Sequence, residues 1–209
     1  MIWKVVTLLT GLIVLFSACK KGELAFVLEG NVEDATLGSS LSGANVSIYT
    51  FSSGSSIGVL AKTITTNSQG DYSYELVRDR YDKIEISVHK ENYFSFLDII
   101  PFDDLTTEES NKFDYSLNAK SWTRFVIINQ QPNQSDEFKL LKESGKENCD
   151  ECCPNSFSYY YGAVDTVVYC PNNANSTMKF YFWVNGNQAN GVDSVYNTAF
   201  DTITREFIY

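Results

Sequence analysis

The sequence is poor in histidine, the side chain on which much enzyme chemistry depends. His89 is the only one among 209 residues, so a Ser–His–Asp triad would have to use it. The alternation around it places His89 on the same outward face as Glu85 and Ser87, so we expect a solvated surface side chain. We expect no nucleophile elbow to accompany it, and one imidazole is too few for His-based catalytic zinc.

Basic charge and long apolar runs are also scarce. Sixteen Lys and Arg against 26 Asp and Glu give a net charge of −10, which repels phosphates, and no basic stripe offsets it. The apolar segment 5–16 is short of the roughly 20 residues that a membrane-spanning helix needs. No helical period persists beyond one or two turns. We therefore expect no nucleic-acid partner and an all-β fold.

The N-terminus carries an export signal. The apolar segment 5–16 is followed by two small residues and then Cys19. This order resembles the lipobox of bacterial lipoproteins. The resemblance implies removal of the signal peptide 1–18, acylation of Cys19 with chains such as palmitate, and a lipid tether over 19–23. The alternatives are an ordinary secretory signal with an incidental cysteine, and an uncleaved anchor.

The lipid anchor implies a membrane location. Several acyl chains, at about 0.8 kcal/mol per buried CH₂, would hold the protein on a bilayer durably. Lys20 stands where Gram-negative lipoproteins retained in the inner membrane have Asp. We therefore expect a lipid-anchored outer-membrane protein, on either the periplasmic or the cell-surface face.

Residues 24–120 show the pattern of a β-sandwich. Apolar and polar residues alternate, so that Ile84, Ile86 and Val88 are expected on one buried face. Turn residues separate the alternating segments, which is typical of a sandwich of seven or eight short strands. Strands are predicted at 24–33, 44–51, 57–66, 71–77, 81–90, 92–100 and 112–119.

Three short phrases in this region carry a family resemblance. They are Gly30 with Val32, then Leu41-Ser-Gly-Ala-Asn-Val46, then Thr66-Asn-Ser-Gln-Gly70 with Tyr72. Together they resemble the carboxypeptidase regulatory-like domain, from which the chain departs at Ser40 and Asn67. The resemblance implies a seven-stranded, transthyretin-like sandwich. By analogy it also implies a docking appendage with a protein partner in the outer membrane.

Residues 121–209 read as a second β unit, in which we recognise no family. Strands are predicted at 122–129, at 158–170 with a break at Gly162, at 177–184 and at 202–209. Segment 137–142 is either a strand or one helical turn. The turn signal at Asn185 and Gly186 does not lead directly into a predicted strand.

Four cysteines in an exported chain indicate two disulfides. They are Cys149, Cys152, Cys153 and Cys170. Pairing the adjacent Cys152 and Cys153 needs a strained ring, so we expect Cys170 to bond one of these two and Cys149 the other. A four-thiolate zinc site is the alternative, disfavoured by the oxidising compartment and the acidic neighbours.

Aromatic residues lie on both faces of two predicted strands. The outward candidates are Tyr159, Tyr161, Tyr181 and Trp183. A sandwich core needs rings on one face only, so these four are a candidate surface for a sugar or a protein partner. The alternative, which we favour from the sequence, is that this face packs against the first unit.

Paired acids are the remaining enzymatic possibility. Asp103, Asp104, Glu108 and Glu109 share one loop, and glycosidases need only two carboxylates. Acidic loops are more often merely solvated. We therefore predict two β-sandwich-like units in a non-enzymatic outer-membrane lipoprotein with no cofactor and no metal, acting as a binding or structural accessory. A carbohydrate-binding lipoprotein and a glycan hydrolase are the alternatives.

Overall fold

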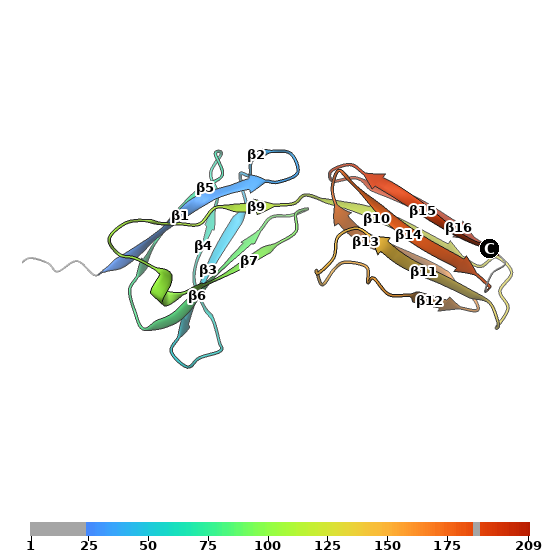
Figure 1. The fold of residues 1–209 in the computed structure, drawn as a ribbon, viewed down its shortest axis with the longest axis horizontal. Coiled ribbons are helices and arrows are strands. Elements are labelled where there is room, and N and C mark those ends of the chain that lie inside the picture. Colours follow the sequence, from blue (N-terminus) through green and yellow to red (C-terminus); the bar gives the residue numbers. More distant parts are fainter. Residues whose placement is uncertain (1–23, 186–188) are drawn as a thin grey trace, which may run out of the picture.

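The computed structural model describes residues 24–185 and 189–209, and their fold is all-β. The only helical element in these ranges is a single 3₁₀ turn, η2 (Phe102–Asp104). Figure 1 shows two β units placed end to end, joined where β9 leads into β10. The prediction of an all-β chain with two sandwich-like units is confirmed. Cys19 and the other signal and tether residues lie outside the described ranges.

The first unit consists of two facing sheets. One has β1 at its centre, flanked by β2 and β5, and β1 also pairs in parallel with β8 and β9. The other has the order β4-β3-β6-β7. The strands are β1 (Ala25–Asp34), β2 (Ser39–Ser40), β3 (Asn45–Ser52), β4 (Val59–Thr65), β5 (Asp71–Val77), β6 (Tyr81–His89), β7 (Phe96–Pro101), β8 (Asn111–Lys112) and β9 (Tyr115–Leu117).

The predicted alternation places the core of this unit correctly. Ile84, Ile86 and Val88 are fully buried on β6. Val88 and Ile86 pair with Val46 and Ile48 of the neighbouring β3. Side chains point alternately to the two faces of a strand, so one face of each strand supplies the core. Apolar burial of this kind is the main favourable term in folding.

The three phrases of the first unit meet in space. Leu41 N–H donates to the Val32 carbonyl at 2.8 Å, and Val32 N–H donates to the Gly70 carbonyl at 2.9 Å. The Thr66 hydroxyl donates to the Leu41 carbonyl at 2.6 Å and accepts from Ala44 N–H at 2.9 Å. These bonds join the end of β1 and the turn between β4 and β5 to the segment just before β3. The phrases are therefore structural.

The second unit also has two facing sheets, with the orders β13-β10-β16 and β12-β11-β14-β15. β10 and β16 run parallel, and the other pairs are antiparallel. The strands are β10 (Lys120–Ile128), β11 (Glu137–Ser144), β12 (Ser158–Tyr161), β13 (Asp165–Asn173), β14 (Ser176–Val184), β15 (Ala189–Asn197) and β16 (Thr202–Ile208). Phe125, Phe138 and Phe180 are fully buried between the sheets.

One strand of this unit was not predicted. β15 pairs with β14 over its full length, but only Val195 and Asn197 are buried on it. An edge strand with a single buried apolar side chain has too weak an alternation to stand out in the sequence. Segment 137–142, for which a strand and a helical turn were both considered, belongs to the strand β11. The predicted break at Gly162 is present, between β12 and β13.

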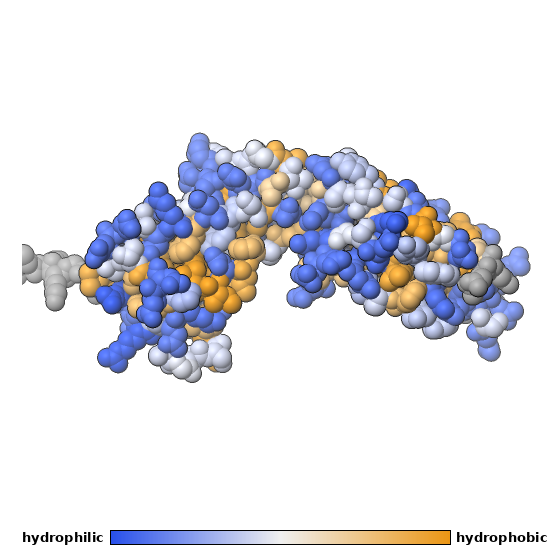
Figure 2. All heavy atoms as spheres, viewed as in Figure 1, coloured by the Kyte–Doolittle hydropathy of each residue, from blue (hydrophilic) through white to orange (hydrophobic). Residues whose placement is uncertain are grey.

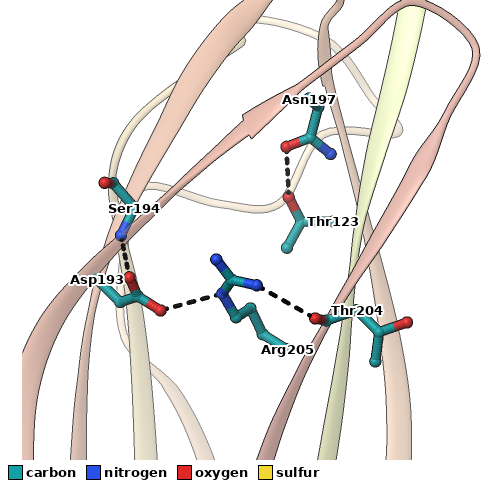
Figure 3. Close-up of polar contacts among 6 residues, drawn as sticks. All are labelled: Thr123, Asp193, Ser194, Asn197, Thr204 and Arg205. Carbon is teal, nitrogen blue, oxygen red and sulfur yellow. Dashed lines mark hydrogen bonds and ion pairs between the residues drawn. The ribbon is translucent and has the colours of Figure 1, made fainter.

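Polar contacts connect the two sheets where β15 and β16 lie at their edges (Figure 3). Arg205 Nε of β16 contacts Asp193 Oδ2 of β15 at 3.1 Å. Thr123 Oγ1 of β10 is 3.5 Å from Asn197 Oδ1, which is fully buried. Figure 2 shows hydrophobic residues at the surface of both units, interspersed with hydrophilic ones.

The two units contact each other through the loop after β6. The Phe94 ring lies 5.2 Å from the ammonium groups of both Lys120 and Lys146, which belong to the second unit. The rings of Tyr93 and Phe200 are 5.4 Å apart. Lys120 N–H also donates to the Asn92 carbonyl at 2.8 Å. The connection between the units is thus braced by side chains and backbone.

Candidate binding surface

The four cysteines form two disulfides, Cys149–Cys152 and Cys153–Cys170. The prediction of two disulfides is confirmed, with the pairing that leaves the adjacent cysteines unjoined. Because all four sulfurs are used, no thiolate remains for the tetrahedral zinc site that was the alternative.

The disulfides fasten the long loop that precedes β12. Cys170 lies in β13 and is 1% exposed, so Cys153 is attached to the core of the second unit. Cys149 and Cys152 close a small ring within the same loop. Glu151, inside the ring that Cys149 and Cys152 close, contacts Lys120 Nζ at 2.6 Å. The middle of the loop that leads into β12 is therefore held by an ion pair and a disulfide.

The four predicted aromatic residues lie on the outer face of one sheet. The register of β11 places Lys139 opposite both Tyr159 of β12 and Trp183 of β14. Tyr161 lies opposite Glu137 and Tyr181 opposite Leu141. The structure thus brings together residues from two strands that are not neighbours in the sequence.

These rings form one continuous row with a fifth member, Phe157. Tyr161 and Tyr159 have centroids 6.1 Å apart and planes within 6°. Phe157 is 5.9 Å from Tyr159 and 5.3 Å from Trp183, and Trp183 is 5.8 Å from Tyr181. Such spacings are those of favourable aromatic pairs. We call these five residues the aromatic row.

Much of the aromatic row is accessible. Tyr161 is 64% exposed, Tyr159 49% and Phe157 42%, whereas Trp183 and Tyr181 are half-buried. The alternative that this face packs against the first unit is wrong, because the rings contact one another and remain open to solvent. The inward-facing Tyr160, between two of them, packs on the core instead.

Charged side chains next to the row are paired with each other. Lys139 Nζ is 2.6 Å from Glu137 Oε1, and Lys179 Nζ is 2.7 Å from Glu143 Oε2. The Tyr181 hydroxyl donates to Glu143 at 2.9 Å. Hydrogen bonds from Lys179 and Tyr181 lower the pKa of the Glu143 carboxyl, and donating to Glu143 raises the pKa of the Tyr181 hydroxyl. The four charges sum to zero.

Phe157 was missed by sequence reasoning. It lies just before the predicted strand, yet 157, 159 and 161 share the two-residue period of a strand face. Extending the alternation backward by one step would have found it. The charged partners Lys139 and Glu143 carried no such signal, because only the pairing of β11 with β12 and β14 places them there.

The residues considered for catalysis lie apart from the row. His89 is exposed, as predicted, and its Nδ1 is 2.9 Å from Ser95 Oγ. Asp103, Asp104, Glu108 and Glu109 are exposed on the loop between β7 and β8. An exposed loop lacks the cleft that holds a scissile bond between two carboxylates.

The expectation of no nucleophile elbow was wrong as a statement about the sequence. Gly54, Ser56 and Gly58 have the Gly-x-Ser-x-Gly spacing. Ser56 lies in the loop between β3 and β4, which is not the strand–turn–helix setting of such a nucleophile. Ser52 pairs with Tyr81, so this loop and His89 lie at opposite ends of β6, about 25 Å apart. They cannot form a triad.

Within 24–185 and 189–209, no group of three or more His, Cys, Asp or Glu side chains is arranged to hold a metal ion. In the same ranges, no helix has the length and hydropathy to cross a membrane.

Comparison with known proteins assigns no family. No family model matches the chain, and no curated protein matches it. Solved structures resemble it at low identity. The Bacillus anthracis TIE protein is 13% identical with a TM-score of 0.40, over 88% of this chain and 34% of that one. A streptococcal ancillary pilin is 9% identical with a TM-score of 0.38, over 90% of this chain and 63% of that one.

A third example is the minor pilin GBS52 of Streptococcus agalactiae, 11% identical with a TM-score of 0.36, over 88% and 94% of the two chains. The chain spans about a third of the TIE protein and less than two thirds of the ancillary pilin. At these identities and TM-scores the likenesses carry no assignment of activity or partner.

Proposed function

We propose that this chain is a non-enzymatic lipoprotein of the outer membrane that presents a binding surface on its second unit. The observation that carries the proposal is the exposed aromatic row on β12 and β14. Contiguous exposed rings beside polar groups mark interaction sites more often than they serve stability. In Figure 1 the row's strands and the start of β1 lie in different units, so a tether before β1 would leave the row free.

Several features support the non-enzymatic part of the proposal. His89 is exposed and lies far from Ser56, the serine of the Gly-x-Ser-x-Gly sequence. The candidate acids are exposed on the loop between β7 and β8. General acid–base chemistry depends on groups within hydrogen-bond reach of a bound substrate in a shielded site. The exposed positions of these side chains do not provide one.

The first unit is proposed to be a spacer and docking module of the carboxypeptidase regulatory-like type. Its support is the convergence of Val32, Leu41, Thr66 and Gly70, the residues of the three phrases, on one hydrogen-bonded frame. The Thr66 hydroxyl and the backbone groups of Val32 and Leu41 are used in that frame. The unit would thus position the binding surface away from the membrane without chemistry of its own.

The anchor is tested with Cys19→Ala in cells fed a radioactive fatty acid. We expect label in the natural protein and none in the variant, with the natural protein in the outer-membrane fraction and the variant released. The lipobox offers one thiol for acylation, so a Ser17→Ala control, which keeps a small residue, should be labelled normally. Equal labelling of the natural protein and Cys19→Ala would refute the anchor.

A further inference from the structure

The aromatic row combines exposed rings with a surrounding set of hydrogen-bonding groups. The rings of Tyr159 and Tyr161 are stacked with their planes within 6°, and the two side chains are 49% and 64% exposed. Their ring surface is apolar, whereas tyrosine and indole carry a polar atom at the edge. A ligand that fits must therefore offer flat apolar faces and many polar edges at the same time.

The charged side chains around the row further restrict the class of ligand that can bind there. Lys139 is paired with Glu137 and also lies 5.5 Å from the Tyr159 ring, while Lys179 is paired with Glu143. A polyanion would have to displace these carboxylates from their lysines. A polycation would have to compete with lysines for the same acids. The chain as a whole carries −10, which further disfavours anionic ligands.

We propose that the aromatic row binds a neutral glycan chain, a proposal that rests on the binding role given to the second unit above. A sugar ring has C–H faces that pack on aromatic rings and hydroxyl edges that both donate and accept. The carboxylates of Glu137 and Glu143 accept from such hydroxyls, and the ammonium of Lys139 donates to them. Because the glycan brings no charge, the existing ion pairs need not be broken.

The geometry suits an extended chain of sugars better than a single one. Three rings lie along the β12 side of the sheet and two lie beside them on β14, with centroid spacings of 5.3 to 6.1 Å between contacting rings. Successive sugars of a chain can each meet a ring, so that weak contacts add within one molecule. The platform is rigid because the strands carry four of the rings and the Cys153–Cys170 disulfide fastens the loop that carries Phe157.

The experiment uses the processed chain, 19–209, with Cys19→Ser, so that its outcome does not depend on the lipid anchor. This protein is titrated separately with four neutral hexasaccharides, and binding is measured by calorimetry and by tryptophan fluorescence. The four are cellohexaose, mannohexaose, laminarihexaose and maltohexaose. Hexagalacturonate is the acidic comparison. We expect at least one neutral hexasaccharide to bind and to change the emission of Trp183, with hexagalacturonate binding more weakly.

Variants locate the site. Tyr159→Ala should weaken binding of the neutral hexasaccharide that binds best by at least about tenfold. Tyr159→Phe keeps the ring and should keep most of the affinity. Tyr169→Ala is the matched control, because Tyr169 is 56% exposed on the other sheet of the same unit. Circular dichroism and melting confirm that each variant is folded.

Two outcomes overturn the proposal. The first is that none of the four neutral hexasaccharides binds the folded protein, which would leave a protein partner as the occupant of the row. The second is that Tyr159→Ala and Tyr161→Ala, both folded, bind as the natural chain does. The Cys19 labelling experiment is independent of both outcomes. A failure of the glycan proposal is therefore distinguished from a failure of the lipid-anchor proposal.

Discussion

At the residue scale, the motif glycines of the first unit are explained by close approaches of the backbone. A Cβ on Gly30 would lie 1.9 Å from the Phe113 carbonyl oxygen. Gly70 has a φ of +82°, and its Cβ would lie 2.4 Å from the Val32 carbonyl oxygen. Backbone atoms cannot move aside as the end of a flexible side chain can. Both glycines are therefore required by packing. Because their role is structural, the phrases indicate a fold and do not indicate an activity.

Gly30→Ala should destabilise the protein by about 2–3 kcal/mol, because the new methyl overlaps a carbonyl inside the sheet and forces β1 away from the segment around Phe113. Urea unfolding followed by circular dichroism measures the change.

Gly38→Ala is the control. Gly38 has a φ of +67°, but nothing lies within 4 Å of its Cβ position, so only the conformational cost of about 1 kcal/mol applies. Equal losses for the two variants would mean that the contact with Phe113 is not what requires glycine at position 30.

At the scale of elements, the loop between β11 and β12 depends on its disulfides. It lacks regular strands, and Phe157 stands at its end. The Cys153–Cys170 bridge joins residues 17 apart, whereas Cys149–Cys152 joins residues three apart. On the chain-entropy model, the longer closed loop restricts the unfolded chain more.

Replacing both Cys153 and Cys170 by alanine should lower the free energy of unfolding by about 3 kcal/mol, and replacing Cys149 and Cys152 by about 2 kcal/mol. The same urea titration under oxidising conditions gives both values. Because Cys170 is in the core, alanine is used rather than serine, which would bury a hydroxyl. A larger loss for the Cys149 and Cys152 pair would contradict the loop-length account.

At the scale of the whole molecule, the junction between the units decides where the binding surface lies relative to the first unit. Phe94 is 6% exposed and lies between two lysines of the second unit. Cation–ring contacts of this kind contribute about 0.5–2 kcal/mol each. Only two residues separate β9 from β10, so the short linker itself limits how far the two units can move relative to each other.

Phe94→Ala should loosen the two units from one another while each keeps its own core. We expect a broader distance distribution in small-angle X-ray scattering. The free energy of unfolding should fall by about 3–4 kcal/mol, because a buried ring is lost together with both lysine contacts. Phe96→Ala is the comparison, since Phe96 is 46% exposed and contacts Tyr115 within the first unit. A scattering profile unchanged by Phe94→Ala would show that the backbone pairing at Asn92 and Lys120 suffices to hold the units.

The sequence by itself determined the strands and their buried faces, because alternation is a local property. Ile84, Ile86 and Val88 could be placed in a core without knowing what they face. It also determined that the chain has two disulfides. The pattern failed at β15, where one buried valine is too little signal.

Only the tertiary structure decided which residues become neighbours. The Cys153–Cys170 disulfide joins a loop to β13, and the row from Tyr161 to Tyr181 joins β12 and β14, which lie on either side of β11. Strand order and register are properties of the whole sheet, set by the combined burial of many side chains. That is why the aromatic face was only a candidate in the sequence and is a continuous surface in the fold.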